Sequence, residues 1–298
     1  MSELQVRGII PPMITPFKEN GDLDYNAFVR NVEHWNNDQL GGYLVLGSNS
    51  EAAFLSYEEK LRLIELTVKN AGKGRTIIAG TGLESTRETI RLTNQAAKLG
   101  AQAALVLTPF YYIDQMGDEA LIVYFKEVAD HSDVPILIYN VPKFTHVNVS
   151  VNVVKTLSGY PNIIGMKDST GNIEQLSAFK KVVDSKFNLI VGTASALYPA
   201  LKLGVRCGIL ALSNCLPNQC AQIQTAFESG NMKDAEEIHK RIVPVNAAVT
   251  ATYGVAGLKY ACTLMGYEGG HVRSPLLPLT DSAKKEIQSI FFDTGILG

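Results

Sequence analysis

The fold of this chain is decided by three short apolar runs, ALVL at residues 104–107, ILIY at 136–139 and IIGM at 163–166. None of them alternates apolar with polar residues, as a strand with one solvent-exposed face would. Strands that are buried on both faces have this continuous pattern, and they belong to parallel sheets covered by helices. Hairpin signals are absent as well. The three runs therefore predict a parallel sheet inside an α/β protein.

The pattern extends outward from these runs, so that strand and helix segments alternate through the first two thirds of the chain. Two helix segments, 56–70 and 85–99, open with a serine that is followed three residues later by glutamate, the capping-box pattern. Eight strands are predicted, at residues 8–14, 42–46, 76–80, 103–107, 135–139, 163–167, 189–192 and 208–212. Eight βα units favour a closed (β/α)8 barrel, or TIM barrel, over an open doubly wound sheet with fewer strands.

The last third of the chain reads as helical. Helices are predicted at residues 218–229, 232–251, 255–265 and 281–292. We therefore expect a barrel over residues 1–216, and C-terminal helices over 217–298 that comprise the eighth barrel helix and an extension packed on the barrel. A chain of 298 residues fits this plan, because α/β barrels of about 200 to 250 residues commonly form one domain.

Composition excludes several classes of protein. Hydrophobic residues make up 46% and charged residues 19%, which permits a large core and argues against disorder. The formal charge of -2, from 27 basic and 29 acidic residues, offers no basic field for nucleic acid. The four cysteines show no CxxC spacing, which suits a reducing compartment. No leader or long apolar stretch is evident, so we expect a cytoplasmic protein away from membranes, or an organellar one whose presequence is missing.

Motifs for metal and cofactor binding are also absent. The five histidines are scattered without HxxxH or HExxH spacing. The chain has no GxxxxGK[ST], GxGxxG or GxSxG sequence, so nucleotide phosphates, dinucleotides and the serine-hydrolase elbow lack their signatures. We expect no metal and no cofactor.

Lys167 is the most informative residue, because it ends the apolar run at 163–166. The active site of a (β/α)8 barrel lies at the C-terminal ends of its strands. Burial there favours a neutral amine, which is a nucleophile toward ketones. A lysine at this place could instead pair with a carboxylate or extend to the surface. We favour a Schiff-base lysine.

Polar groups at other strand ends complete the candidate site. Tyr139 ends the neighbouring run, where a phenol either transfers protons or packs as a structural residue. The turn GSNSE at 47–51 presents consecutive N–H groups that suit a carboxylate, although ordinary capped turns have the same composition. Gly192 ends the seventh run and lets a ligand approach the backbone. The aromatic residues of TPFYY at 108–112 could line the mouth, reach a neighbouring subunit or simply pack.

Four motifs in this order, GSNSE, TPFYY, YNVP at 139–142 and GMKDS at 165–169, carry a family resemblance. The chain resembles the dihydrodipicolinate synthase and N-acetylneuraminate lyase family of class I aldolases over its whole length. Within that family it looks most similar to 4-hydroxy-2-oxoglutarate aldolases, through GSN, GLEST, TPFYY, GMKDS, and PVNAAVT followed by GLK. The resemblance implies a pyruvate-derived 2-oxo acid substrate and a homotetramer built from two dimers.

The resemblance also implies a role for each matching residue. Lys167 would form the imine with the 2-oxo carbon, and Tyr139 would transfer protons. Ser48 and Tyr111 would hydrogen-bond in a relay with that tyrosine, Tyr111 reaching the site across a subunit contact. Further residues would bind substrate: Ser48 and Asn49 would hold the carboxylate, while Ser169 and Gly192 would line the far side of the pocket.

Two departures from the family pattern bear on the substrate. Phe144 stands where the synthase pattern has an arginine, the usual partner of a second carboxylate, and His146 stands where it has glycine. We assign Phe144 to the substrate pocket, and its apolar ring argues against dihydrodipicolinate synthesis. Ser50 replaces a glycine of the family turn, which leaves the carboxylate-binding turn open to question.

The first hypothesis is a retro-aldolase that splits 4-hydroxy-2-oxoglutarate, or another 4-hydroxy-2-oxo acid, into pyruvate and an aldehyde, which is glyoxylate for the named substrate. Dihydrodipicolinate synthesis and the cleavage of a 2-keto-3-deoxy sugar acid are the alternatives that use the same imine. A barrel that binds an oxo acid without turning it over is the alternative from a different class.

Overall fold

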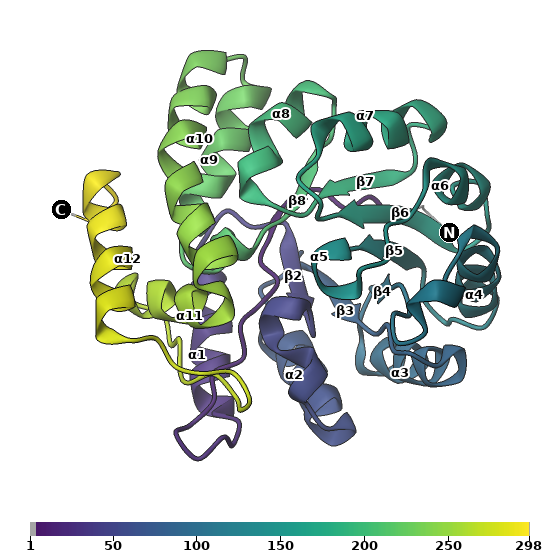
Figure 1. Ribbon diagram of the computed structural model, residues 1–298, viewed down its shortest axis with the longest axis horizontal. Coiled ribbons are helices and arrows are strands. Elements are labelled where there is room, and N and C mark those ends of the chain that lie inside the picture. Colours follow the sequence, from purple (N-terminus) through teal and green to yellow (C-terminus); the bar gives the residue numbers. More distant parts are fainter. Residues whose placement is uncertain (1–3, 298) are drawn as a thin grey trace.

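Eight parallel strands form a barrel in the computed structural model, which describes residues 4–297, and helices surround it (Figure 1). The strands are β1 (Gly8–Ile10), β2 (Gly42–Val45), β3 (Thr76–Gly80), β4 (Ala103–Leu107), β5 (Ile136–Asn140), β6 (Ile163–Asp168), β7 (Asn188–Val191) and β8 (Cys207–Ile209). Their order is β1-β8-β7-β6-β5-β4-β3-β2. The parallel bridge between Pro12 and Leu44 joins the first and second strands. The predicted (β/α)8 barrel is confirmed.

Two predicted strands are longer than the observed ones. The strand expected at 8–14 ends at Ile10, because Pro11 and Pro12 have no N–H group to continue a ladder. The strand expected at 208–212 ends at Ile209, and Ala211–Asn214 form a buried 3-10 turn instead. The side-chain amide of Asn214 donates to the Pro12 carbonyl in this turn at 3.0 Å. The chain therefore leaves both terminal strands early.

Helices cover the outside of the barrel. They are α1 (Tyr25–Trp35), α2 (Tyr57–Asn70), α3 (Thr86–Leu99), α4 (Asp118–Asp130), α5 (Pro142–Thr145), α6 (Val151–Leu157), α7 (Ile173–Val182) and α8 (Leu197–Lys202). The capping box predicted for α2 is present, since Ser56 and Glu59 exchange hydrogen bonds between side chain and backbone. At α3 only Ser85 caps, because the Glu88 carboxylate bonds Arg91 at 3.1 Å instead.

The C-terminal helices are α9 (Pro217–Glu228), α10 (Met232–Asn246), α11 (Gly254–Leu264) and α12 (Asp281–Asp293), at the left of Figure 1. The helix predicted at 232–251 changes to a π-helix, Ala247–Thr252, shortly after Pro244, which has no N–H for the regular ladder. α10 packs against both α9 and α8. The division at 216 and 217 stays a prediction, and its residues 1–3 and 298 lie outside the described range.

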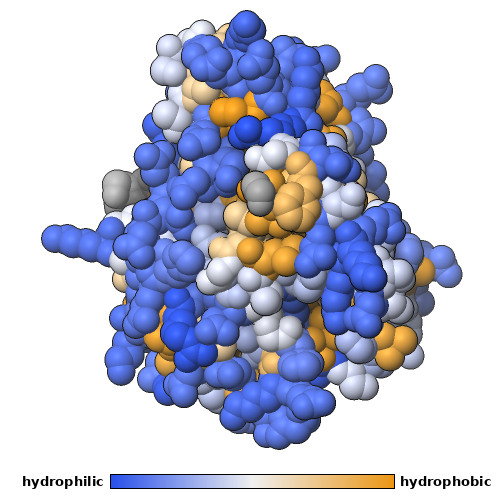
Figure 2. All heavy atoms as spheres, turned by 90° about the vertical axis from the view of Figure 1, so that its left-hand side faces the viewer, coloured by the Kyte–Doolittle hydropathy of each residue, from blue (hydrophilic) through white to orange (hydrophobic). Residues whose placement is uncertain are grey.

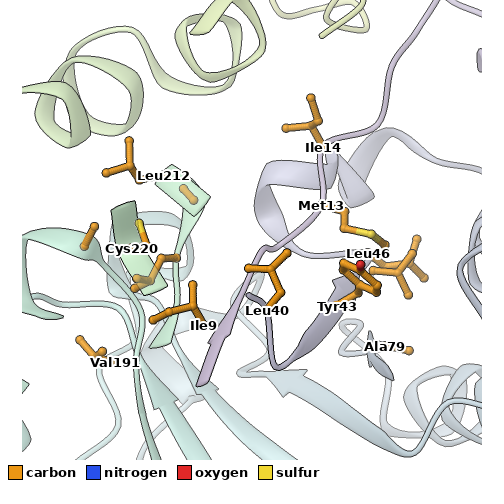
Figure 3. Close-up of a cluster of buried hydrophobic side chains, with 14 of the residues drawn as sticks. Ile9, Met13, Ile14, Leu40, Tyr43, Leu46, Ala79, Val191, Leu212 and Cys220 are labelled. Atoms are coloured by element: carbon orange, nitrogen blue, oxygen red, sulfur yellow. The ribbon is translucent and has the colours of Figure 1, made fainter. Parts of the chain in front are cut away.

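Two clusters of buried apolar side chains form the core. One fills the barrel interior and includes Ile10, Leu44 and Tyr139. The other lies between the strands and the helices, and Figure 3 shows part of it, from Ile9 to Tyr43. Successive residues of a strand point to opposite faces, which is why neighbouring strand residues enter different clusters. All four cysteines are free and buried.

The outer face of the C-terminal helices is mainly hydrophilic, with its most extensive apolar area near the centre and smaller ones elsewhere (Figure 2). Among the described residues no helix is long and apolar enough to cross a membrane. The predicted compartment stays a prediction.

Candidate active site

Lys167 lies inside the barrel near the C-terminal end of β6, with only 3% of its surface exposed. It is in register with Tyr139 of β5 and Ile190 of β7, both of which belong to the interior cluster. Its Nζ atom lies 4.1 Å from the centroid of the Tyr139 ring. Within residues 4–297 no carboxylate forms an ion pair with it. The alternatives of a lysine paired with a carboxylate and of one that reaches the surface therefore do not describe this side chain.

Asp168, the next residue, faces a separate polar network. Its carboxylate accepts hydrogen bonds from Asn140 Nδ2 at 2.7 Å, Thr170 Oγ1 at 2.6 Å and Gln175 Nε2 at 3.3 Å. Burial raises the pKa of Asp168, while the hydrogen bonds from Thr170 and Asn140 oppose that rise. Both carboxylate oxygens are thus occupied away from Lys167.

The Tyr139 phenol connects Lys167 to the turn after β2. Its hydroxyl lies 3.4 Å from Ser48 Oγ. Burial by itself would raise the pKa of Tyr139, but the nearby Lys167 charge and the Ser48 hydrogen bond outweigh it, so the pKa lies below its ordinary value of 10. A phenol that ionises more readily is better suited to accept and return a proton. Lys167, Tyr139 and Ser48, which come from the C-terminal ends of three different strands, therefore form one constellation.

The turn after β2 keeps two backbone donors unused. Ser48–Ser50 form a 3-10 turn in which the N–H groups of Ser50 and Glu51 bond the Gly47 and Ser48 carbonyls. The N–H groups of Ser48 and Asn49 have no acceptor within the part of the chain that the structure describes. Two adjacent free N–H groups suit a carboxylate.

Ser50, the departure from the family turn, belongs to the scaffold. Its hydroxyl donates to the Met13 carbonyl and accepts from the Gly47 N–H at 3.1 Å. Its own carbonyl accepts from Thr15 Oγ1 at 2.8 Å. Because the side chain is buried and bonded to the chain after β1, serine at this position preserves the turn.

Gly192 and Ser169 lie in contact where β7 and β6 end. A side chain at position 192 would place its Cβ 2.0 Å from Ser169 Oγ and 2.8 Å from the Asp168 carbonyl oxygen. The buried Ser169 Oγ has no hydrogen-bond partner among residues 4–297. Glycine is therefore required here, and the serine hydroxyl, which lies close enough to the Tyr139 phenol to help lower its pKa, keeps hydrogen-bonding capacity for another group.

Two predicted site residues lie on the surface. The Tyr111 side chain is 75% exposed, in a loop whose N–H groups at Phe110 and Tyr111 both donate to Glu84 Oε2. Phe144 is 53% exposed on α5. A contact of Tyr111 with a neighbouring subunit and a contact of Phe144 with substrate both stay predictions.

Sequence reasoning missed several buried polar groups at this end of the barrel. Thr108 Oγ1 follows β4 and has no described partner, and neither has the Asn246 Oδ1 atom, whose Nδ2 donates to Thr193 Oγ1 at 3.3 Å. Lys259 and Glu51 form an ion pair whose side chains are 2% and 1% exposed. Burial lowers the pKa of Lys259 to about 8, although Glu51 acts in the opposite direction. A single lysine in the apolar stretch of α11 was the available signal.

No metal site emerges from the described residues, since no three His, Cys, Asp or Glu side chains gather in a suitable group. The expectation of catalysis without metal or cofactor stays a prediction.

Comparison with known proteins gives one consistent result. The model of the dihydrodipicolinate synthetase family matches residues 5–292. A 4-hydroxy-tetrahydrodipicolinate synthase of Bartonella tribocorum is 37% identical over 294 residues, covering 98% of this chain and 99% of the relative. The synthase of the same name from Methanothrix thermoacetophila is 34% identical over 285 residues, covering 95% of each chain.

Solved structures agree with the sequence relatives. A dihydrodipicolinate synthase from Bacillus anthracis superposes with a TM-score of 0.92 at 28% identity, covering 99% of both chains. The chloride-inhibited dihydrodipicolinate synthase of Acinetobacter baumannii, complexed with pyruvate, gives a TM-score of 0.92 at 28% identity, covering 98% of this chain and 100% of that one.

Proposed function

The chain belongs to the dihydrodipicolinate synthetase family of pyruvate-dependent class I aldolases, and from this membership we propose that Lys167 forms an imine with pyruvate or a pyruvate-derived 2-oxo acid. The observation that carries the proposal is a buried amine without an ion-pair partner, 4.1 Å from the centre of a phenol ring. Once its proton has been removed, such an amine can attack the 2-oxo carbon, and loss of water then gives the imine.

The other groups of the site fit the steps around this imine. The free N–H groups of Ser48 and Asn49 would hold the carboxylate beside the 2-oxo carbon. Tyr139 would move protons to and from the substrate, with Ser48 completing the relay. The unused hydroxyl of Ser169 would bond the substrate on the opposite side. The protonated imine would withdraw electrons from the substrate without a metal.

For the complete reaction, we place 4-hydroxy-tetrahydrodipicolinate synthesis first. Several relatives that align over nearly all of this chain carry that name. In this reaction the pyruvate imine would lose a proton from C3, and the resulting enamine would form a carbon–carbon bond with the aldehyde carbon of aspartate semialdehyde. The amino group of the semialdehyde unit would then attack the imine carbon, which closes the ring of the product and releases the Lys167 amine.

Cleavage of 4-hydroxy-2-oxoglutarate is the second candidate, and Phe144 is the observation that favours it. The synthase pattern has an arginine at this position, and the 4-hydroxy-2-oxoglutarate aldolases, which the chain resembles, lack that arginine as this chain does. In the cleavage the C3–C4 bond would break toward the protonated imine while Tyr139 takes the C4 hydroxyl proton. Glyoxylate would leave, and protonation and hydrolysis of the enamine would release pyruvate.

Reductive trapping tests the imine. Borohydride added with pyruvate should attach one pyruvate-derived group, and peptide mapping should place it on Lys167. Lys259 is an internal comparison, because it is equally buried but paired with Glu51. Lys167→Ala should give no adduct and lose at least about a thousandfold in turnover. An adduct on another lysine, or turnover that survives this substitution, would contradict the proposal.

A substrate panel separates the candidate reactions. Condensation of pyruvate with aspartate semialdehyde is compared with pyruvate release from 4-hydroxy-2-oxoglutarate and from 2-keto-3-deoxy sugar acids. Phe144→Arg is the matched variant, and it should raise condensation with aspartate semialdehyde relative to the cleavage of 4-hydroxy-2-oxoglutarate, because it restores the arginine of the synthase pattern. An unchanged ranking of substrates in that variant would remove Phe144 from the specificity argument.

A further inference from the structure

A buried ion pair lies behind the turn that carries Ser48 and Asn49. Lys259 Nζ of α11 lies 2.5 Å from Glu51 Oε1 and also donates to the His271 carbonyl. The same Nζ atom lies 4.5 Å from the centroid of the Phe17 ring. The pair therefore joins the C-terminal helices to the residue that directly follows the turn.

The second oxygen of Glu51 is held as well. Glu51 Oε2 accepts the Arg273 N–H at 2.8 Å. Arg273 in turn bonds both carboxylate oxygens of Glu59 at 2.7 Å, and its guanidinium lies 4.3 Å from the Phe17 ring centroid. Both supports of Glu51 thus come from the last fifth of the chain, and each is fixed by further contacts.

Glu51 itself has a conformation that needs such support. Its φ of 55° and ψ of 36° are left-handed, a region that a residue with a side chain adopts at a cost. Its carbonyl and N–H both take part in the short turns on either side. A shift of Glu51 would therefore move the backbone of the preceding turn.

We propose that Glu51 and Lys259 are positioning residues, which hold the turn so that the N–H groups of Ser48 and Asn49 point at the substrate carboxylate. This inference rests on the carboxylate role assigned to the turn under the proposed function. Stability alone is a poor reason for such a pair, because apolar side chains of similar size often replace a buried ion pair without loss of stability. The location of the pair, directly behind two unused N–H groups, supplies the functional reason.

Three variants separate positioning from stability. Lys259→Met leaves the Glu51 carboxylate buried without its cation, so its melting temperature should fall. The double variant Glu51→Gln/Lys259→Met removes both charges, so its melting temperature should return toward that of the wild type. Arg75→Met is the matched control: Arg75 donates to the Asn36 and Asp38 carbonyls, at 2.9 and 2.7 Å, where β3 begins at the opposite end of the barrel.

The decisive measurement is the pyruvate concentration that half-saturates borohydride trapping at Lys167. It should rise by about tenfold or more in Lys259→Met and stay raised in the double variant, although the double variant is again stable. Arg75→Met should lower the melting temperature and leave half-saturation unchanged. If Lys259→Met does not fold, the pyruvate concentration that half-saturates trapping in the double variant tests the positioning role by itself.

Two outcomes would overturn the positioning role. One is a double variant that recovers the pyruvate affinity of the wild type together with its stability, which would make the pair structural only. The other is wild-type half-saturation in every variant. Failure of the wild type to form any adduct is a different result, because it would overturn the proposed function and the positioning role with it.

Discussion

Lys167 and Lys259 are two buried lysines whose surroundings give them different chemistry. Lys167 has a phenol ring beside it and no ion-pair partner among the residues that the structure describes, which leaves its amine available to a carbonyl group. Lys259 is held by Glu51 and by the His271 carbonyl, which leaves little freedom to react. The environment of a lysine, rather than its burial, decides whether it can be a nucleophile.

Of these two lysines, only Lys167 could be predicted from the sequence as a site residue. Lys167 was predictable because a charged residue ends an apolar run, and strand ends carry the chemistry in a barrel. Lys259 was not, because its partner Glu51 lies on a distant element and no local spacing connects them. The role of Ser50 was hidden for the same reason, since its hydroxyl bonds the carbonyl of Met13, in the chain that follows β1.

Titration of Tyr139 provides a test at this scale. Burial opposes ionisation of Tyr139, but the Lys167 charge and the hydrogen bonds from Ser48, Lys167 and Ser169 together outweigh it, so its tyrosinate should form below pH 10 in the wild type. Substitution Lys167→Met removes the charge and one hydrogen bond and leaves burial, so the pKa of Tyr139 should rise. Tyrosinate absorbance as a function of pH measures both.

Tyr139→Phe is the control, because it should abolish the rise in tyrosinate absorbance below pH 10 that we assign to Tyr139. Burial raises the pKa of Tyr43 to about 12 and that of Tyr124 further, so neither should contribute to this rise. An early tyrosinate that persists unchanged in Lys167→Met would show that the lysine does not set this pKa.

At the scale of elements, two strands from the middle of the chain were predicted more closely than the first and the last strand. β3 and β4 have the predicted bounds, because their apolar runs end where the buried segment ends. β1 and β8 are shorter, because prolines and a buried 3-10 turn take over where the hydropathy pattern continues. The π-helix after Asn246 had no sequence signal beyond Pro244.

The contact between Gly192 and Ser169, the residues that directly follow β7 and β6, can be tested by substitution. Gly192→Ala forces a methyl group against Ser169 Oγ and the Asp168 carbonyl, so we expect a loss of about 1–3 kcal/mol in the free energy of unfolding. Trapping with pyruvate should weaken as well, because the Ser169 hydroxyl is displaced. Denaturant unfolding and the trapping assay measure the two effects.

Gly159→Ala is the matched comparison for this substitution. No atom lies within 4 Å of the Cβ that it would add, and it should change stability by less than about 0.5 kcal/mol. Equal stability of the two variants would mean that the strand ends can separate to admit the methyl group.

At the scale of the whole molecule, one chain holds only part of the predicted relay. Lys167, Tyr139 and Ser48 come together within the barrel, whereas Tyr111 is 75% exposed and lies beside Tyr112, which is 67% exposed. Sequence patterns could predict which residues face the barrel interior but not which surface meets a second copy. A relay that includes Tyr111 from a neighbouring copy would need at least a dimer, and the predicted tetramer stays a prediction.

Mixing two inactive variants tests whether Tyr111 acts across a subunit contact. Lys167→Ala lacks the nucleophile, and Tyr111→Phe lacks the relay hydroxyl. In a mixed dimer, one site would combine Lys167 from one subunit with Tyr111 from the other and be complete, while the second site would lack both groups. With random exchange at equal amounts, half of the dimers are mixed, so activity should recover to about a quarter of the wild-type value. If Tyr111 serves the site of its own subunit, every site lacks one group and mixing restores nothing.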